Sequence, residues 1–171
     1  ARLCDGVRLH GFATRAYVEQ VVRPLLASEL EKRGLGFENF EVTGGGFIAT
    51  GPNESAVAAA AEKIRYRVAF YGSTPAYWPV FEVHGLGDLG RKLNAMTKAG
   101  QWDKIAGEVS DDVVHLFSAV GRHDQLEKAV TERFGGLVDS ISASASSSKP
   151  SDLPPGLIQD LQRIPTKYRT T

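Results

Sequence analysis

The chain has 171 residues, which is enough for one hydrophobic core, and its 20 basic residues balance its 20 acidic ones. A formal net charge of zero carries no electrostatic signature of a nucleic acid or an anionic membrane as a partner, and charges interrupt every apolar stretch well before the ~20 residues of a membrane span. The single cysteine fits a reducing cytoplasm and excludes an internal disulfide, and the four scattered histidines show no metal-binding spacing, so we expect no metal site.

The first residues predict a strand followed by a helix. Residues 7–10 alternate apolar and polar side chains, as a half-buried strand does. Because the sequence starts with a predicted strand that no turn precedes, we expect the chain to be the second part of something longer. Thr14 predicts the N-cap of the following helix, whose apolar positions recur every three or four residues as far as Leu30. Pro24 should kink or break this helix, and Gly34 should end it.

A second strand is predicted over residues 40–49, and three consecutive glycines at positions 44–46 interrupt its side-chain pattern. Glycines permit close approach, so this run indicates either a tight packing point or bulge, or room for a planar ligand. A turn at residues 50–53 follows, with Asn53 as the N-cap of an alanine-rich helix over residues 56–71. Strand, turn and helix in this order are the repeating unit of an α/β fold.

The remaining segments continue this pattern toward the C-terminus. Residues 72–87 form an ordered excursion that is too rich in apolar and aromatic side chains for disorder. The segments after it are predicted to be a helix over 89–98, one or two helices within 102–117, a helix over 124–134, a strand over 138–143, a low-complexity stretch over 144–150 and a small helix around 157–161.

One motif in this region admits a different interpretation. Residues Gly85–Gly90 match the GxGxxG fingerprint of nicotinamide dinucleotide binding, and residues 80–84 before them resemble a strand. Asp88, however, suits a helix N-cap better than a neighbour of a pyrophosphate, and residues 101–105 lack the apolar strand that a βαβ unit requires. A nicotinamide-dinucleotide-binding module through Gly85–Gly90 is therefore the less favoured alternative.

Four segments taken together resemble the C-terminal half of the bacterial luciferase-like monooxygenase superfamily, and most closely its deazaflavin-dependent oxidoreductase branch. They are Asp5–Phe12, Phe40–Gly51, Ala69–Tyr77 and His84–Asn94. The resemblance extends over residues 1–145, which makes it more specific than any single motif. It implies an α/β fold, the C-terminal part of a (β/α)8 TIM barrel with about three parallel strands and flanking helices. Residues 146–171 would then form a low-complexity linker with a short C-terminal helix and tail.

The resemblance also implies where a site would form, because barrel pockets lie at the C-terminal ends of the strands. His10, just past the first strand, is the candidate catalytic residue, for substrate polarisation or proton transfer. The candidate substrate-binding residues are Gly11, Thr14, Thr50 and His115, with Ser144 expected on the same rim. For His10 the alternative is a histidine that fixes a loop, and for His115 it is a surface position on a helix. The main coenzyme contacts are expected on N-terminal barrel strands outside this sequence, so no cofactor-binding residue is assigned.

The function that the resemblance implies is that of an oxidoreductase or monooxygenase. A hydride would pass between a deazaflavin, coenzyme F420, and an organic substrate, with FMN as the close variant. As a fragment of such an enzyme, the chain would contact the small-molecule substrate and the coenzyme but would be inactive alone. An alternative of another class is a non-catalytic half-barrel module for assembly or binding, which a homo-oligomer covering its open sheet edges would indicate.

Overall fold

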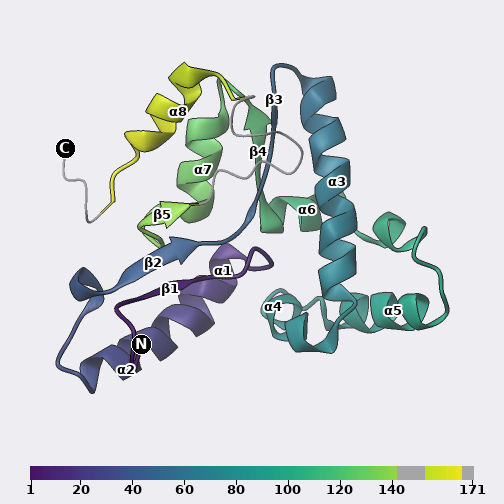
Figure 1. The fold of residues 1–171 in the computed structure, drawn as a ribbon. Helices are drawn as coiled ribbons and strands as arrows, with labels where there is room; N and C mark the ends of the chain where they lie inside the picture. The colour runs from purple at the N-terminus through teal and green to yellow at the C-terminus, as the bar shows by residue number, and fades with distance from the viewer. Residues whose placement is uncertain (142–152, 167–171) are drawn as a thin grey trace.

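The chain folds into parallel strands flanked by helices (Figure 1). The computed structural model describes residues 1–141 and 153–166. The strands in these residues are β1 (Gly6–Arg8), β2 (Glu41–Gly44), β3 (Phe47–Gly51), β4 (Ser118–Arg122) and β5 (Ser140–Ile141). The α-helices are α1 (Arg15–Tyr17), α2 (Arg23–Glu31), α3 (Glu54–Gly72), α4 (Trp78–Glu82), α5 (Gly87–Lys98), α6 (Asp111–Phe117), α7 (Leu126–Phe134) and α8 (Pro155–Gln162). The predicted α/β class is confirmed.

The strands of the described chain fall into two sheets in which neighbours run parallel. The first sheet has the order β1-β2-β5, with Val7 opposite Val42 and Gly44 opposite Ile141. The second sheet pairs β3 with β4. Parallel neighbours require crossover connections, and helices supply them here, as in the βαβ unit that the sequence predicts.

The segment predicted as one strand over residues 40–49 is two strands, β2 and β3, which belong to different sheets. The break falls at the glycine run. A Cβ atom on Gly45 would lie 2.4 Å from the carbonyl oxygen of His10, and one on Gly46 would lie 2.7 Å from the ring of Phe134. The glycines therefore form a tight packing point, which is the first of the two interpretations of this run.

Strand β4 is absent from the sequence-based expectations, which end a helix at Phe117 and resume with a helix at residue 124. Its five residues include an alanine, a glycine and an arginine, and they show no apolar alternation. β4 forms because β3 offers it a complete set of partners, from Phe47 opposite Ser118 to Gly51 opposite Arg122. Such a partner lies far away in the sequence, so local periodicity does not reveal the strand.

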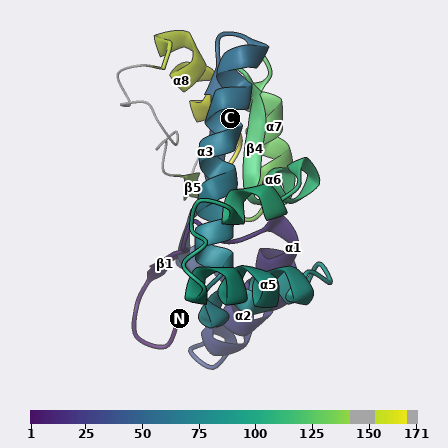
Figure 2. The same cartoon turned by 90° about the vertical axis from the view of Figure 1, so that its right-hand side faces the viewer.

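The β3–β4 pair is covered on both faces. Phe47 and Ala49 belong to a core formed with α3, whereas Ile48 between them packs in a second core with α7 and α8. This alternation follows from the two-residue period of strand side chains. The chain crosses from β3 to β4 through α3 and then returns through α7 to β5, which pairs with β2. As a result α3 packs on one face of the β3–β4 pair and α7 on the other (Figures 1 and 2).

The larger core contains a group of aromatic rings between α3 and the helices that follow it. Phe12 stacks on Phe117 with 4.5 Å between ring centroids and meets Phe81 edge-on at 5.4 Å. All three side chains are buried, and burying each one stabilises the fold by about 1.5–3 kcal/mol. Because Phe12 follows β1, these contacts tie the loop that carries His10 to the body of the fold.

Local signals predicted the N-caps of α1 and α3 correctly. Oγ1 of Thr14 accepts a hydrogen bond from the backbone N–H three residues later at 3.2 Å, and Oδ1 of Asn53 accepts the equivalent bond at 2.9 Å. The interruption expected at Pro24 is a π-helical turn over Val18–Val22, immediately before α2. It arises because proline has no N–H to donate to the preceding turn.

The nicotinamide alternative lacks the strand that it requires. Residues 80–84 belong to α4 and the turn after it, so the segment Gly85–Gly90 follows a helix. The N-cap of α5 is Leu86 rather than Asp88, which lies in the first turn and pairs with Arg91 at 2.7 Å. Without a preceding strand, the GxGxxG pattern here is a glycine-rich helix entry.

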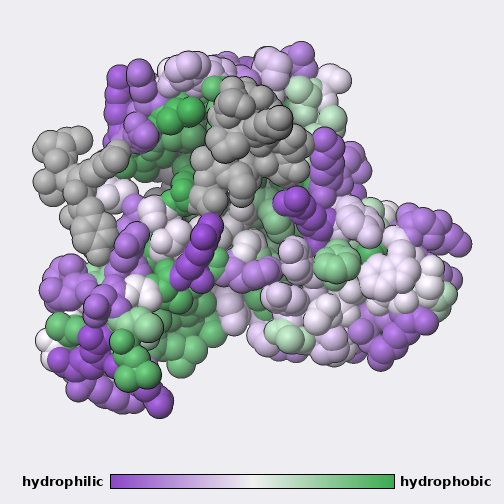
Figure 3. Space-filling view, in the orientation of Figure 1, coloured by the Kyte–Doolittle hydropathy of each residue, from purple (hydrophilic) through white to green (hydrophobic). Residues whose placement is uncertain are grey.

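The C-terminal segment agrees with its prediction where it is described. Strand β5 starts the strand expected over 138–143, and α8 is the small helix expected around 157–161. The boundary at residue 145 and Ser144 on the expected rim lie outside the described residues, so the division into residues 1–145 and 146–171 stays a prediction. Figure 3 shows apolar surface beside α8 and again around β1, β2 and α2, where Leu25 is 65% exposed.

Candidate functional site

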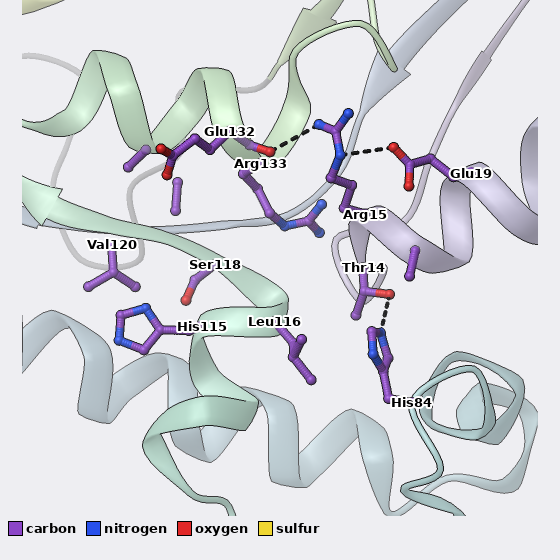
Figure 4. Close-up of a pocket in the computed structure, with 13 residues that line it drawn as sticks. Thr14, Arg15, Glu19, His84, His115, Leu116, Ser118, Val120, Glu132 and Arg133 are labelled. Carbon is purple, nitrogen blue, oxygen red and sulfur yellow. Dashed lines mark hydrogen bonds and ion pairs between the residues drawn. The ribbon is translucent and has the colours of Figure 1, made fainter.

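A cavity of about 380 Å³ lies where five segments of the described chain meet. Its walls come from the start of α1, the π-helical turn, the α6–β4 junction, α7, and the turn between α4 and α5 that carries His84 (Figure 4). Small-molecule sites in proteins commonly have 300–1,000 Å³. The cavity is therefore large enough for a small organic molecule.

Arg133 of α7 is the most unusual group in this cavity. Its side chain is 7% exposed, and one Nη2–H donates to the carbonyl oxygen of Ala13. Nε is buried without a hydrogen-bond partner in the described chain. The guanidinium lies over the ring of Phe134, 4.8 Å from its centroid. Among the described residues no carboxylate forms an ion pair with Arg133, although a buried charge is ordinarily paired.

Burial, together with the smaller effect of the positive charge of Arg15, lowers the pKa of Arg133 to about 10. The guanidinium therefore still carries its charge at neutral pH. Arg15 itself is well satisfied, because it pairs with Glu19 at 2.9 Å and donates to the carbonyl oxygens of Glu132 and Gly135 at 3.0 and 3.1 Å. These carbonyls belong to the end of α7, where a cation also meets the negative end of the helix dipole.

His84 and Thr14 form the opposite side of the cavity. His84 Nε2 and Thr14 Oγ1 lie 2.7 Å apart, and a neutral imidazole can make this hydrogen bond in either tautomer. Burial lowers the pKa of His84 below its usual 6.5, and the charge of Arg133 lowers it further. The imidazole is therefore neutral at pH 7. The fold brings this histidine, which is not among the candidate residues of the sequence, to the cavity wall.

His10, the candidate catalytic residue, lies outside this cavity. It is exposed after β1, and its Nδ1 accepts a hydrogen bond from the backbone N–H of Phe12 at 3.0 Å. Two tyrosine rings that contact each other pack against the imidazole, with centroids 4.9 Å away for Tyr71 and 5.1 Å away for Tyr77. An imidazole whose Nδ1 accepts a hydrogen bond carries its proton on Nε2, so the outward nitrogen is a donor.

The four candidate substrate-binding residues do not line one common pocket. Thr14 and His115 both line the large cavity, Gly11 lines a separate cavity of about 140 Å³ beside the glycine run, and Thr50 lines a third of about 190 Å³ under α8. The Oγ1 atom of Thr50 is buried without a partner in the described chain. The roles assigned to these residues and to His10 therefore stay predictions.

Sequence reasoning missed Arg133, although the sequence contains a signal for it. Arg133 lies on the same stripe of α7 as Leu126, Val130 and Phe134, all of which are buried. A cation at a position that the helical period assigns to the core must find a partner, a ligand or a route to solvent. Neither the missing partner nor the neighbouring cavity can be inferred from that stripe alone.

Two classes of feature are absent from the described residues. No three His, Cys, Asp or Glu side chains gather there in an arrangement that could hold a metal ion. None of the described helices combines the length and the apolar character that crossing a lipid bilayer demands.

Comparison with known proteins adds the family context. Uncharacterized proteins from Mycobacterium bovis and Mycobacterium tuberculosis are 36% identical to the chain over 139 residues, which is 81% of this chain and 41% of each relative. The chain thus spans about two fifths of the length of these curated relatives. A solved structure, that of coenzyme F420 dependent tetrahydromethanopterin reductase from Methanopyrus kandleri, superposes with a TM-score of 0.69 at 17% identity and covers 95% of this chain and 45% of that one.

The structural likeness confirms the expected fold class, that of the luciferase-like TIM barrel. At 17% identity, this structural likeness is evidence for the fold alone. The sequence profile of the luciferase-like monooxygenases matches residues 1–140, which is most of the chain and agrees with the resemblance in its four segments. The chain therefore belongs to the luciferase-like monooxygenase family.

Proposed function

We propose that the chain is the C-terminal part of a luciferase-like oxidoreductase in which a hydride passes between a deazaflavin coenzyme and an organic substrate. The observation that carries this proposal is the family match over residues 1–140. The choice of a deazaflavin over FMN rests on the structural neighbour, which is described as dependent on coenzyme F420. The coenzyme would supply the redox chemistry, and the protein would orient and protonate the substrate.

The cavity of about 380 Å³ does not offer an apolar slot for a tricyclic ring. Its wall contains two arginines, Arg15 and Arg133, and the histidines His84 and His115. We therefore expect the main ring contacts on barrel strands outside this chain. For the same reason the chain alone would bind the coenzyme weakly and would not turn over.

His10 is the residue of this chain best suited to move a proton. Its Nδ1 is held by the N–H of Phe12, so the exposed Nε2–H can donate to a substrate oxygen as charge develops there. Tyr71 and Tyr77, whose rings also contact each other, pack against the imidazole. This arrangement fixes which nitrogen faces a substrate, and a positioned general acid typically contributes about 10²–10⁴-fold in rate.

The proposal is tested by titrating coenzyme F420 and FMN into the 171-residue chain and into the complete protein encoded by its gene, with coenzyme fluorescence as the signal. We expect the complete protein to bind F420 at least ~100-fold more tightly than the chain, which is a difference of about 2.7 kcal/mol. If the complete protein binds FMN and not F420, the proposed coenzyme is a flavin and not a deazaflavin. A complete protein that binds neither coenzyme would refute the oxidoreductase function.

A matched pair of variants tests His10 in the complete protein. His10→Asn keeps a side-chain acceptor for the N–H of Phe12 but loses the outward donor, whereas His10→Gln keeps an outward donor that does not titrate. If His10 transfers a proton, both variants lose kcat by about 10²-fold or more and the pH dependence of kcat disappears. If His10 only fixes the loop, His10→Asn retains most of the activity.

The open sheets favour one second candidate, a non-catalytic assembly module. Both strands of the β3–β4 sheet and the outer strands β1 and β5 have an unpaired edge in the described chain, and exposed edges promote association. This function predicts a stable homodimer of the chain by sedimentation, together with a complete protein that binds no coenzyme.

A further inference from the structure

We propose that the cavity between α1, β4 and α7 binds a small molecule through an oxyanion, a phosphate or carboxylate group, with Arg133 as the principal ligand. The chemistry of the coenzyme does not enter this inference, which stands whether or not the proposed redox function is correct. Nothing in the family match or in the structural likeness assigns a role to this arginine.

The first argument is the unused hydrogen-bonding capacity of Arg133. A guanidinium presents five N–H donors in a planar fork that matches the two oxygens of a carboxylate or phosphate. In the described chain Nη2 donates to the carbonyl oxygen of Ala13, while the buried Nε has no partner. A buried donor without a partner is costly, so a group that completes the fork would be bound with a gain in free energy.

The second argument is the charge balance of the cavity walls. Arg15 is offset by Glu19 at 2.9 Å, and the carboxylate of Glu132 has Lys128 as its partner at 3.8 Å. His115 is exposed at the mouth, and His84 is neutral at pH 7 for the reasons given above. The charge of Arg133 is therefore the one that remains without a counter-charge among the described wall residues. An anion is the ligand that this wall selects.

The third argument is the space in front of the guanidinium. A volume of about 380 Å³ lies within the 300–1,000 Å³ that small-molecule sites commonly have, so a small organic molecule fits there. Thr14, Ser118 and His84 add polar atoms to the wall, whose apolar residues include Leu116, Ala119 and Val120. Such a mixture suits an organic molecule whose oxyanion is anchored at one end.

The rival explanation is that Arg133 is a purely structural cation. It would then only bridge α7 to the carbonyl of Ala13 and cover the ring of Phe134. The two explanations differ in what happens when an anion is offered. A structural cation ignores it, whereas a binding site loses its unpaired charge and is stabilised by mass action.

Inorganic phosphate is the probe, and the 171-residue chain is the protein. We expect phosphate to raise the Tm and to shift the Nε–Hε NMR signal of Arg133 in a saturable way. The pKa of His84 should rise on binding, because the anion cancels the repulsion from Arg133. Arg133→Met should weaken phosphate binding by roughly 10- to 100-fold. Arg91→Met, which removes an exposed arginine of α5, is the matched control and should bind as the original chain does.

Two results would overturn the proposal. One is an Nε–Hε signal of Arg133 in the original chain that does not respond to phosphate, a measurement that requires no variant to fold. The other is phosphate binding by Arg133→Met that equals that of the Arg91→Met control. Arg133→Lys keeps the charge without the fork and should bind with intermediate affinity. Adding coenzyme F420 to the phosphate-loaded complete protein identifies the carrier, because displacement assigns the oxyanion to the coenzyme and retention beside bound coenzyme assigns it to the substrate.

Discussion

Gly45 connects the stability of the fold with the position of the candidate catalytic residue. The Cβ atom of Gly45→Ala would lie 2.4 Å from the carbonyl oxygen of His10 and 2.5 Å from that of Leu9. Ordinary van der Waals contact begins at 3.4 Å, so one backbone segment must move by about 1 Å. Because both atoms are backbone, no side-chain rotation relieves the clash.

The expected cost follows from two effects. Inserting a methyl group into a packed site typically costs about 1–3 kcal/mol. The displaced segment also includes Leu9, whose N–H donates to the carbonyl of Thr43 at 2.9 Å at the end of the β1–β2 pairing. Weakening that hydrogen bond costs about 1 kcal/mol more. We therefore expect Gly45→Ala to lower the free energy of unfolding by about 3 kcal/mol, which corresponds to a Tm decrease of about 8 °C for a chain of this length.

Urea unfolding of the 171-residue chain measures this change, with Gly107→Ala as the control. A Cβ on Gly107 would have no heavy atom within 4 Å, so alanine there should be neutral or stabilise by up to about 1 kcal/mol. If Gly45→Ala lowers the free energy of unfolding by less than about 1 kcal/mol at an unchanged m-value, the glycine run does not pass as close to His10 as described.

Two further predictions concern protonation and capping. The pKa of His84 is lower in the folded chain than in the unfolded chain. As the pH falls below about 6.5, the unfolded chain therefore takes up a proton on this histidine more readily than the folded chain does. The contribution of His84 to the free energy of unfolding is thus fully present above about pH 6.5 and is lost as the pH falls. His84→Gln should therefore flatten the pH dependence of the urea midpoint between about pH 7 and 5, and an unchanged profile would contradict the buried neutral state. Asn53→Ala removes the cap of α3 and should cost about 1 kcal/mol of unfolding free energy, whereas Asn53→Asp should retain it; equal losses in both would point away from capping.

The helices could be predicted because their determinants are local. Thr14 and Asn53 cap helices that begin one residue later, and the buried stripe of α3, including Ile64 and Val68, recurs at the spacing of helical turns. The family could be recognised for a related reason, since the four segments that carry the resemblance keep their order along the chain. Each of these signals requires only residues that are close together in the sequence.

The strands and the cavity could not be predicted in this way, because their partners are remote. The glycine run separates β2 from β3 only because the end of β1 passes close to Gly45, and β4 exists only because β3 pairs with it. Arg133 lies on a predictable stripe of α7, yet its contact with Ala13 spans most of the chain. Thr14 and His115 meet at one cavity while Gly11 and Thr50 line others. Periodicity indicates which side of an element is buried, whereas the neighbours on that side, and hence the unpaired charge of Arg133, follow from how distant segments pack together.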